Sequence, residues 1–232
     1  QNQIKKHGHL VDYYACVSQT ALDSFLELFP ELKQKGKKIY NLLQADVILE
    51  KSKKEVDNFF LSQKSINILT VCRIQEKSKG VFRMAKVLKE LLNLGYNVTW
   101  YIIGDGIDFN AFKNHLEDLK LQDRMILLGA KSNPYPYFKE VDLIAVLSYY
   151  EGLCGVVNEA KILERPLIAT QFSGVREQVT EGVNGFVFEN SYEAILQGMI
   201  HLLDNPTNLN KTAVNGMPKE ITDDDYKVEQ LI

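Results

Sequence analysis

The chain has 232 residues, of which 45% are hydrophobic and 25% are charged, and its formal net charge is −3. These values describe an average soluble globular protein with enough apolar side chains for a core. The small negative charge gives no overall basic field, so it argues against nucleic acid or an anionic membrane surface as the partner.

Residues 1–60 are expected to form one βαβ unit. The pattern consists of two strands at 11–18 and 37–43 and, between them, a helix at 19–29 that Pro30 ends. A single unit of this kind is too small to close a core. We therefore interpret it as the last part of a preceding domain or as a unit that packs on the main one. The polar stretch at 50–65 is the best candidate for a linker.

From residue 66 onward, apolar strands alternate with helices. The predicted strands lie at 66–72, 97–104, 125–129, 141–147, 166–170 and 185–188. The predicted helices lie at 80–95, 109–120 and 192–203, with shorter helical segments between the other strands. Strands that are apolar almost throughout are covered on both faces. Together with the alternation, this predicts a Rossmann-like α/β domain with a doubly wound parallel sheet at 61–232. Right-handed crossovers then place the strand-to-helix loops along one edge, where such folds bind ligands.

The first of these loops, RIQEKSKG (73–80), is rich in cations. Arg73, Lys77 and Lys79 precede the predicted helix start after Gly80. A cation at a helix N-terminus is unfavourable by a few tenths of a kcal/mol, whereas a bound phosphate is attracted by both the helix dipole and the cations. Taken alone, the loop is better explained by solvated lysines, and a phosphate site is the alternative.

The second loop, IIGDGIDF (102–109), holds two glycines but does not form the GxGxxG pattern of dinucleotide binding. The chain also has no GxxxxGK[ST] pattern, which argues against a P-loop. A plain turn is the expected role of GDG.

The stretch EGLCGVVNEA (151–160) combines two glutamates with glycines that allow a ligand close to the backbone. A helix that starts near Gly155 or Val156 would leave the N–H groups of residues 153–156 unpaired and directed into the cleft. Because a carboxylate repels phosphate, Glu151 and Glu159 are expected to accept hydrogen bonds from the hydroxyl groups of a sugar and a ribose. The alternative is a helix-favouring Glu151 and an ordinary surface Glu159.

The remaining chemistry-bearing residues suggest no metal, disulfide or membrane segment. Cys16, Cys72 and Cys154 lack metal-like spacing and are odd in number, so reduced thiols in the cytoplasm are the simplest interpretation. The N-terminus has no signal-peptide core, and no apolar run reaches the roughly 18 residues of a membrane span. The acidic cluster at 223–225 lies in a polar tail and is expected to be a solvated face or a helix start.

Several motifs together resemble the retaining family 4 glycosyltransferases. They are VCRIQEKSKG, WYIIGDG, the long stretch from ILLGAKSN to EGLCGVVNEA, RPLIAT, SGVREQV and GVNGFVF. The resemblance covers nearly all of 66–205. Its most specific feature is the pair of glutamates eight positions apart together with the upstream arginine and Lys-Gly.

This resemblance implies the GT-B fold and a set of site roles. The chain would be the donor-binding half at 61–232, with a remnant of the acceptor-side domain and a linker at 1–60. Arg73 and Lys79 would hold the donor diphosphate without a metal or cofactor, Glu151 would lie against the donor sugar, and Glu159 would bind the ribose. The other implied donor contacts are Ala130 and Lys131 at the base, and Gly152, Leu153, Cys154, Gly155 and Val156 at the phosphates.

The implied activity is transfer of a hexose from a nucleotide diphosphate sugar, with UDP-sugar favoured, to a sugar or lipid-linked acceptor. Polysaccharide or cell-envelope glycan synthesis would be the setting, and this chain alone would bind the donor without transferring it. The resemblance also allows peripheral association with the inner face of the membrane through the domain that this chain lacks. The alternatives are a non-catalytic nucleotide-sugar-binding module and a sugar-nucleotide epimerase of the same fold.

The chain departs from the family pattern at two places. Cys72 stands where the family usually has Gly or Ala before the arginine. The interval from Arg73 to Lys79 is one residue longer than in the commonest form, so Lys77 could replace Lys79 at the phosphate.

Overall fold

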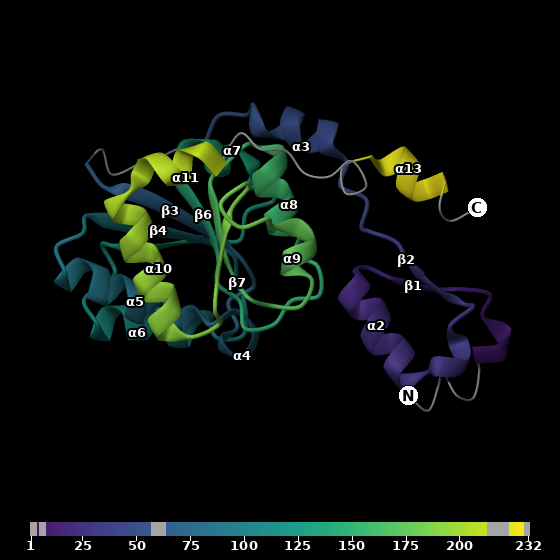
Figure 1. Ribbon diagram of the computed structural model, residues 1–232. Coiled ribbons are helices and arrows are strands. Elements are labelled where there is room, and N and C mark those ends of the chain that lie inside the picture. Colours follow the sequence, from purple (N-terminus) through teal and green to yellow (C-terminus); the bar gives the residue numbers. More distant parts are fainter. Residues whose placement is uncertain (1–3, 5–7, 57–63, 213–222, 230–232) are drawn as a thin grey trace. The chain divides into compact units, whose positions relative to one another are not determined.

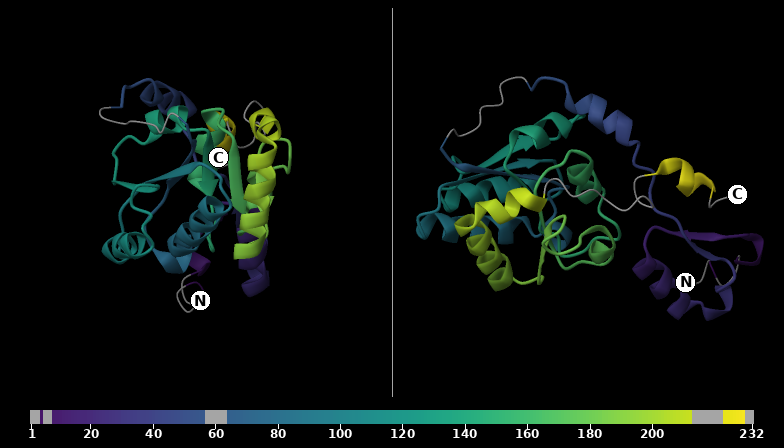
Figure 2. Two further views of the ribbon diagram at one scale, coloured as in Figure 1. Left: turned by 90° about the vertical axis from the view of Figure 1, so that its left-hand side faces the viewer. Right: turned by 45° about the horizontal axis from the view of Figure 1, so that its top comes forward.

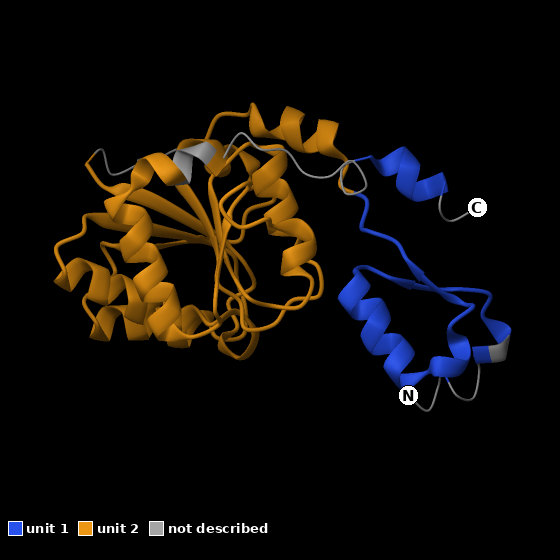
Figure 3. Ribbon diagram, in the orientation of Figure 1, with its two compact units in different colours: residues 1–42, 218–232 blue, residues 43–217 orange. Residues whose placement is uncertain are grey.

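The structure is a computed structural model that describes residues 4, 8–56, 64–212 and 223–229 (Figure 1). The chain forms two compact units, one of residues 1–42 with 218–232 and one of residues 43–217 (Figure 3). The interpretation of residues 1–60 as a domain remnant with a linker remains a prediction.

The smaller unit contains the expected βαβ pattern. Its elements are η1 (Gly8–Leu10), β1 (Tyr14–Cys16), α2 (Gln19–Leu28), η2 (Pro30–Leu32), β2 (Gly36–Lys38) and α13 (Asp224–Glu229). The two strands are parallel, and each is shorter than the sequence predicted. Ser18 caps α2, because its Oγ accepts a hydrogen bond of 3.0 Å from the Ala21 N–H. The predicted helix within 222–232 is confirmed by α13.

The acidic cluster of the tail serves this last helix. Asp223 accepts a hydrogen bond of 3.0 Å from the N–H of Tyr226, and Asp224 pairs with Lys227 at 2.7 Å. Lys227 also donates to the carbonyl oxygen of Asn41 at 2.9 Å. The expectation of a helix start at 223–225 is therefore confirmed.

The larger unit is built on a parallel sheet of six strands. They are β3 (Ile66–Val71), β4 (Val98–Ile103), β5 (Met125–Gly129), β6 (Leu143–Val146), β7 (Leu167–Thr170) and β8 (Phe186–Phe188), in the order β5-β4-β3-β6-β7-β8. This order confirms the predicted doubly wound fold. The chain extends the sheet in one direction from β3 to β5 and then returns to pair β6 with β3. The crevice at the carboxyl ends of β3 and β6 is therefore the topological switch point, where such folds bind ligands.

Helices cover both faces of this sheet (Figure 1 and Figure 2). One layer holds α5 (Val81–Asn93), α6 (Phe109–Asp118) and α10 (Tyr192–Asp204). The other holds α3 (Ala45–Ser52), α7 (Tyr135–Glu140), α8 (Gly155–Ile162) and α9 (Val175–Gln178). The unit also contains α4 (Glu76–Lys79) and α11 (Pro206–Thr212).

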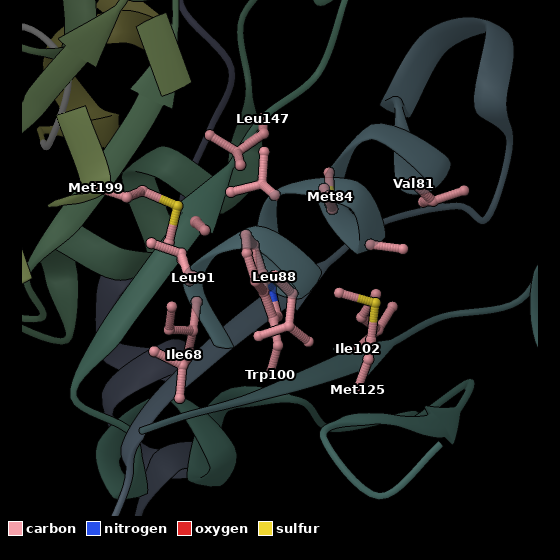
Figure 4. Packing of buried hydrophobic residues seen from close by; sticks show 14 of the residues in the cluster. Ile68, Val81, Met84, Leu88, Leu91, Trp100, Ile102, Met125, Leu147 and Met199 are labelled. Carbon is pink, nitrogen blue, oxygen red and sulfur yellow. The ribbon is translucent and has the colours of Figure 1, made fainter. Parts of the chain in front are cut away.

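The core under α5 packs around Trp100, which is fully buried (Figure 4). Leu88 of α5 and Met199 of α10 belong to the same cluster. The indole N–H donates to Thr70 Oγ1 at 3.0 Å, and this hydroxyl donates to the Ala145 carbonyl oxygen at 2.8 Å. The polar atoms that this core encloses are thus paired, which fixes β3, β4 and β6 side by side.

Besides α4, which lies in the expected first loop, the helices α3 and α11 were not predicted. α3 lies partly inside the stretch expected to be a linker, and its Ile48 is buried in the core between the sheet and α7 and α8. Residues 50–52 of the expected linker are therefore helical, whereas residues 57–63 lie outside the described part. α11 begins with Pro206, which suits a first helical position because the proline N has no hydrogen to leave unpaired.

Candidate functional site

A cavity of about 410 Å³ lies at the switch point, and we call it the switch-point cavity. Each of the loops after β3, β4, β5 and β6 contributes to it. Among its lining residues are Cys72, Arg73, Lys79, Gly104, Ala130, Lys131, Ser148, Glu151, Cys154, Gly155, Val156 and Glu159. Nearly all side chains singled out in the sequence therefore meet in one place. Gly152 and Leu153 are described but do not line the cavity, and Leu153 is buried.

Lys79 and Glu151 form an ion pair inside this cavity. The two side chains are 19% and 16% exposed, and the Lys79 ammonium donates directly to Glu151 Oε1. Ser148 Oγ donates to the same carboxylate oxygen at 2.8 Å. Among the described contacts, Glu151 Oε2 accepts no hydrogen bond, so it is available to a ligand. Lys77 is exposed and does not line the cavity, so the geometry favours Lys79 over Lys77 at this position.

The cationic loop is not arranged as expected. Lys79 lies in the last turn of α4, where a cation is favoured by the helix dipole, and it also directly precedes Gly80, the N-cap of α5. Gly80, with φ of 65°, ends α4 and begins α5. The carboxylate of Glu76 accepts a hydrogen bond of 2.8 Å from the Phe82 N–H. The expectation of a free α5 N-terminus for phosphate is therefore wrong, because Glu76 already occupies it.

Arg73 lines the cavity, and its side chain has no hydrogen-bond or ion-pair partner among the described residues. Its backbone neighbours are nevertheless fixed. The Cys72 N–H donates to the Ile103 carbonyl oxygen at 3.0 Å, and the Ile74 N–H donates to the Asp105 carbonyl oxygen at 2.9 Å. Arg73 thus combines a rigid backbone with a free guanidinium, which suits a residue that awaits an anion.

The GDG turn explains how this backbone is held. A Cβ at Gly104 would lie 1.8 Å from the Cys72 carbonyl oxygen, and one at Gly106 would lie 2.2 Å from the Ile74 carbonyl oxygen. Gly104 also has φ of 150°. Both positions therefore require glycine, because the turn packs directly against the backbone on either side of Arg73. This turn positions the site and has no phosphate motif of its own.

The N-terminus of α8 is held by a buried amide. Gln178 accepts from the Cys154 N–H at 3.1 Å and donates to the Cys154 carbonyl oxygen at 2.8 Å and to Asn158 Oδ1 at 2.7 Å. The expectation that the Cys154 N–H is unpaired is therefore wrong. The N–H groups of Val156 and Val157 face the Cys154 sulfur, whereas the N–H group of Gly155 has no hydrogen bond within the described ranges and is available to an anion at the helix start.

Glu159 lies in the second turn of α8 and is not an ordinary surface residue. Burial raises the pKa of its carboxyl group, and a hydrogen bond with the Tyr135 hydroxyl opposes that rise. The two predicted glutamates therefore border the cavity from the β6–α8 loop and from α8 itself.

The two thiols that line the cavity, those of Cys72 and Cys154, are unreactive. Burial raises the pKa of Cys72 and of Cys154 to about 12 in each case, with Lys79 partly offsetting this effect. A thiol with so high a pKa is protonated at neutral pH, so neither residue has the character of a nucleophile.

The segment at 147–151, which carries Glu151, is held by residues that the sequence did not single out. The carbonyl oxygen of Ser78 accepts from the N–H groups of Tyr149 and Tyr150 at 2.8 and 3.2 Å. Asn190 Nδ2 donates to the carbonyl oxygens of Ser148 and Tyr149, both at 3.1 Å.

Arg83 completes this support. It is 8% exposed, donates to the Leu147 carbonyl oxygen at 2.7 Å and to Asn190 Oδ1 at 2.8 Å, and lies 3.9 Å from the centroid of the Tyr149 ring. These partners lie 64 and 107 positions away in sequence, so no local motif could have revealed them.

Within the described ranges, no group of three or more His, Cys, Asp or Glu residues could hold a metal ion. A search of the same ranges for a helix long and apolar enough to cross a membrane also found none.

Comparison with known proteins places these residues in a family context. Residues 51–218 match the family described as glycosyl transferases group 1. An uncharacterized glycosyltransferase of Methanocaldococcus jannaschii is 28% identical over 159 residues, which are 67% of this chain and 39% of that protein. The poly(glycerol-phosphate) alpha-glucosyltransferase of Bacillus subtilis is 36% identical over 105 residues, or 44% of this chain and 16% of the relative. The capsular polysaccharide biosynthesis glycosyltransferase CapM of Staphylococcus aureus is 26% identical over 137 residues, or 59% of this chain and 36% of the relative.

Solved structures show the same fold. The chain superposes on Anabaena HepE, crystallised with UDP and glucose, with a TM-score of 0.78 and 18% identity over 95% of this chain and 61% of that one. It matches S. aureus TarM with a TM-score of 0.73 and 19% identity over 91% of this chain and 41% of that one. The chain thus spans less than two-thirds of these proteins, and the similarity is one of fold.

Proposed function

The chain belongs to the group 1 family of glycosyl transferases, and from that premise we propose that it is the donor-binding half of a retaining family 4 enzyme. Its fold is that of a GT-B glycosyltransferase, and its relatives include enzymes of polysaccharide and cell-envelope glycan synthesis. In this proposal the switch-point cavity takes a nucleotide diphosphate sugar. The observation that carries the proposal is the meeting of Arg73, Lys79, Glu151 and Glu159 around one cavity.

The cations of the cavity are proposed to bind the diphosphate. Among the described residues, the Arg73 guanidinium has no hydrogen-bond or ion-pair partner, and Lys79, on the same cavity, has Glu151 as its one ion-pair partner. The N–H group of Gly155, which has no hydrogen bond among the described contacts, adds the positive end of α8. When the sugar leaves, negative charge grows on the departing diphosphate, and these groups stabilise it electrostatically. In this proposal no metal ion or other cofactor is required for that role.

The two glutamates are proposed to hold the hydroxylated rings. Glu159 lines the cavity with a carboxylate that already bonds the Tyr135 hydroxyl, and its remaining acceptor positions suit the hydroxyl groups of a ribose. Glu151 keeps Oε2 for a sugar hydroxyl while Lys79 and Ser148 hold Oε1. Ala130 and Lys131, which follow β5, are proposed to contact the base. A UDP-sugar is the favoured donor, and the UDP and glucose in HepE support it.

The acceptor is proposed to be a sugar or a lipid-linked sugar. Among the relatives, a Campylobacter jejuni enzyme is named for transfer to a diphospho-undecaprenol acceptor. Because the chain spans 39% and 36% of two relatives, we infer that acceptor recognition needs residues outside this chain. The 232 residues alone are expected to bind the donor and to transfer little or no sugar. The whole enzyme is expected to work in the cytoplasm, with membrane contact through its other domain.

A thermal-shift panel tests this proposal. The panel contains UDP, GDP and ADP, each with and without its glucose ester, and we expect the melting temperature to rise with one base and with its sugar derivative. A rise of 2.7 kcal/mol in apparent stability corresponds to a ligand at about a hundred times its dissociation constant. The absence of a shift with every nucleotide would contradict a donor site. If the bound donor were released as an epimerised sugar nucleotide, the activity would be epimerisation and not sugar transfer.

A further inference from the structure

A second cavity, of about 640 Å³, lies on the outer side of α5, and we call it the α5 cavity. Its walls come from α4, α5 and α6, from Tyr149, and from the turn before α10. No residue lines both this cavity and the switch-point cavity. The α5 cavity is therefore a separate site, although Tyr149 belongs to the segment that carries Glu151.

The α5 cavity is positively charged although the chain as a whole is negative. Arg83, Lys86 and Lys89 follow one another at intervals of three on α5, so they share one face of the helix. Lys86 and Lys89 are exposed and form no ion pair with any described residue. His115 of α6 also lines the cavity, and Glu76 is the one carboxylate among the described lining residues.

Burial lowers the pKa of Arg83 and the nearby charge of Glu76 only partly opposes this, while Glu76 forms no ion pair with Lys86 or Lys89 among the described contacts. Its Oε2 accepts from the Phe82 N–H at 2.8 Å, and its Oε1 lies 3.5 Å from the Tyr149 hydroxyl. Arg83 donates to neutral oxygens, those of Leu147 and Asn190, and its buried Nε has no hydrogen-bond partner in the described part of the chain. A buried cation with neutral partners is costly, and a bound anion would offset that cost.

The size of the α5 cavity and its other lining groups indicate a ligand that is larger than a bare anion. The cavity is larger than the switch-point cavity and is walled by the apolar side chains of Phe82 and Leu119. Tyr192 and Ser191 bring hydroxyl groups to its rim, and the ammonium of Lys86 lies 4.2 Å from the centroid of the Tyr192 ring. Apolar walls with a few fixed polar groups are typical of small-molecule sites.

We propose that the α5 cavity binds an anionic sugar, with Lys86 and Lys89 contacting its phosphate or carboxylate group. The ring of the sugar lies between the apolar wall and the hydroxyl groups at the rim. This site does not depend on the donor proposal, because it shares no lining residue with the switch-point cavity.

Calorimetric titration of the 232-residue chain tests this site. The ligands are trigalacturonate and glucose 6-phosphate, with maltotriose as the neutral sugar and inorganic phosphate as the bare anion. We expect heat of binding with at least one anionic sugar. Binding of trigalacturonate would identify the anionic group as a carboxylate, and binding of glucose 6-phosphate would identify it as a phosphate. Affinity should fall as salt is raised, because exposed charges are screened. Binding of maltotriose or inorganic phosphate with equal affinity would overturn the proposal.

Variants locate the bound sugar. The double substitution Lys86→Gln/Lys89→Gln should weaken binding on the order of tenfold, which corresponds to about 1.4 kcal/mol. The matched control Lys113→Gln/Lys139→Gln removes the same charge from exposed lysines outside the cavity and should leave the affinity unchanged. Arg73→Ala should also leave it unchanged. Lost binding in Arg73→Ala with full binding in the Lys86/Lys89 variant would place the anion in the other cavity and overturn the proposal, as would no heat with either anionic sugar.

Discussion

Lys161 is a buried amine that the site does not use. It is 5% exposed, its Nζ has no hydrogen-bond partner among the described residues, and burial lowers its pKa from 10.5 to about 7. Between pH 10.5 and 7 the unfolded chain takes up a proton that the folded chain does not, so stability falls as the pH falls through this window. Below it both states are protonated and the loss is complete.

Substitution of this lysine by an apolar residue should therefore stabilise the protein. We expect Lys161→Met to raise the free energy of unfolding at pH 7 by about 1–4 kcal/mol, and the gain should shrink as the pH approaches 10.5. Urea unfolding of both proteins at several pH values measures this difference. A variant that is less stable than the parent at pH 7 would show that the amine has a stabilising partner.

Gly104 should tolerate no side chain. Since an added Cβ would lie 1.8 Å from the Cys72 carbonyl oxygen, Gly104→Ala is expected to cost at least about 3 kcal/mol and to displace the backbone next to Arg73. Gly129→Ala is the matched control, because Gly129 also has positive φ but nothing within 4 Å of the added carbon. It should cost about 1 kcal/mol. Equal losses in chemical denaturation would contradict the close-approach argument.

At the residue scale, the sequence identified the side chains that line the switch-point cavity better than the side chains that hold its loops in place. Arg73, Glu151 and Glu159 could be predicted because charged residues after apolar strands meet at one sheet edge. Asn190 and Gln178 could not, because each acts on a loop that is distant in sequence and close only in the folded chain.

The β6–α8 loop shows how one element fixes another. Asn190, which precedes α10, holds the carbonyl oxygens of Ser148 and Tyr149 and accepts from Arg83. We expect Asn190→Ala to lower the free energy of unfolding by about 1–3 kcal/mol, because buried donors and acceptors lose their partners. It should also weaken UDP binding, since the segment leads to Glu151, whose carboxylate pairs with Lys79 at the proposed diphosphate site.

The control for this substitution is Asn205→Ala. Asn205 also donates from its side-chain amide to a carbonyl oxygen, that of His201, but at an exposed helix end. It should change the free energy of unfolding by less than about 1 kcal/mol and leave UDP binding as it is. Denaturation and calorimetry measure both quantities. Unchanged UDP affinity in Asn190→Ala would show that the loop keeps its shape without the clamp.

At the element scale, periodicity predicted the long elements and missed the short ones. The strands β3 to β8 and the helices α5, α6 and α10 lie close to their predicted positions, because their apolar residues face a core in a regular pattern. α4 has four residues, too few for a helical period, and its presence changes the position of Lys79 relative to the helix dipole. α3 has Ile48 as its one buried apolar residue, so its sequence resembles a polar connection.

At the scale of the larger unit, strand order explains how distant loops reach one cavity. β3, β4, β5 and β6 end along one edge, and the reversal between β3 and β6 opens the crevice. This arrangement was predictable because alternating strands and helices allow few topologies. The α5 cavity was not predictable, because it forms only where the folded chain brings α4, α5, α6 and the start of α10 together.

In the switch-point cavity, the cations are proposed to hold the diphosphate, and the Glu159 carboxylate is proposed to hold the ribose. An NMR titration of UDP and of uridine tests this proposal most directly, with Arg73→Ala, Glu159→Ala and the exposed control Lys77→Ala. We expect Arg73→Ala to weaken UDP binding at least about tenfold. It should leave uridine binding intact, because uridine has no phosphate. Glu159→Ala should weaken both, and Lys77→Ala should weaken neither. Unchanged UDP affinity in Arg73→Ala, or an equal loss for uridine, would contradict the account.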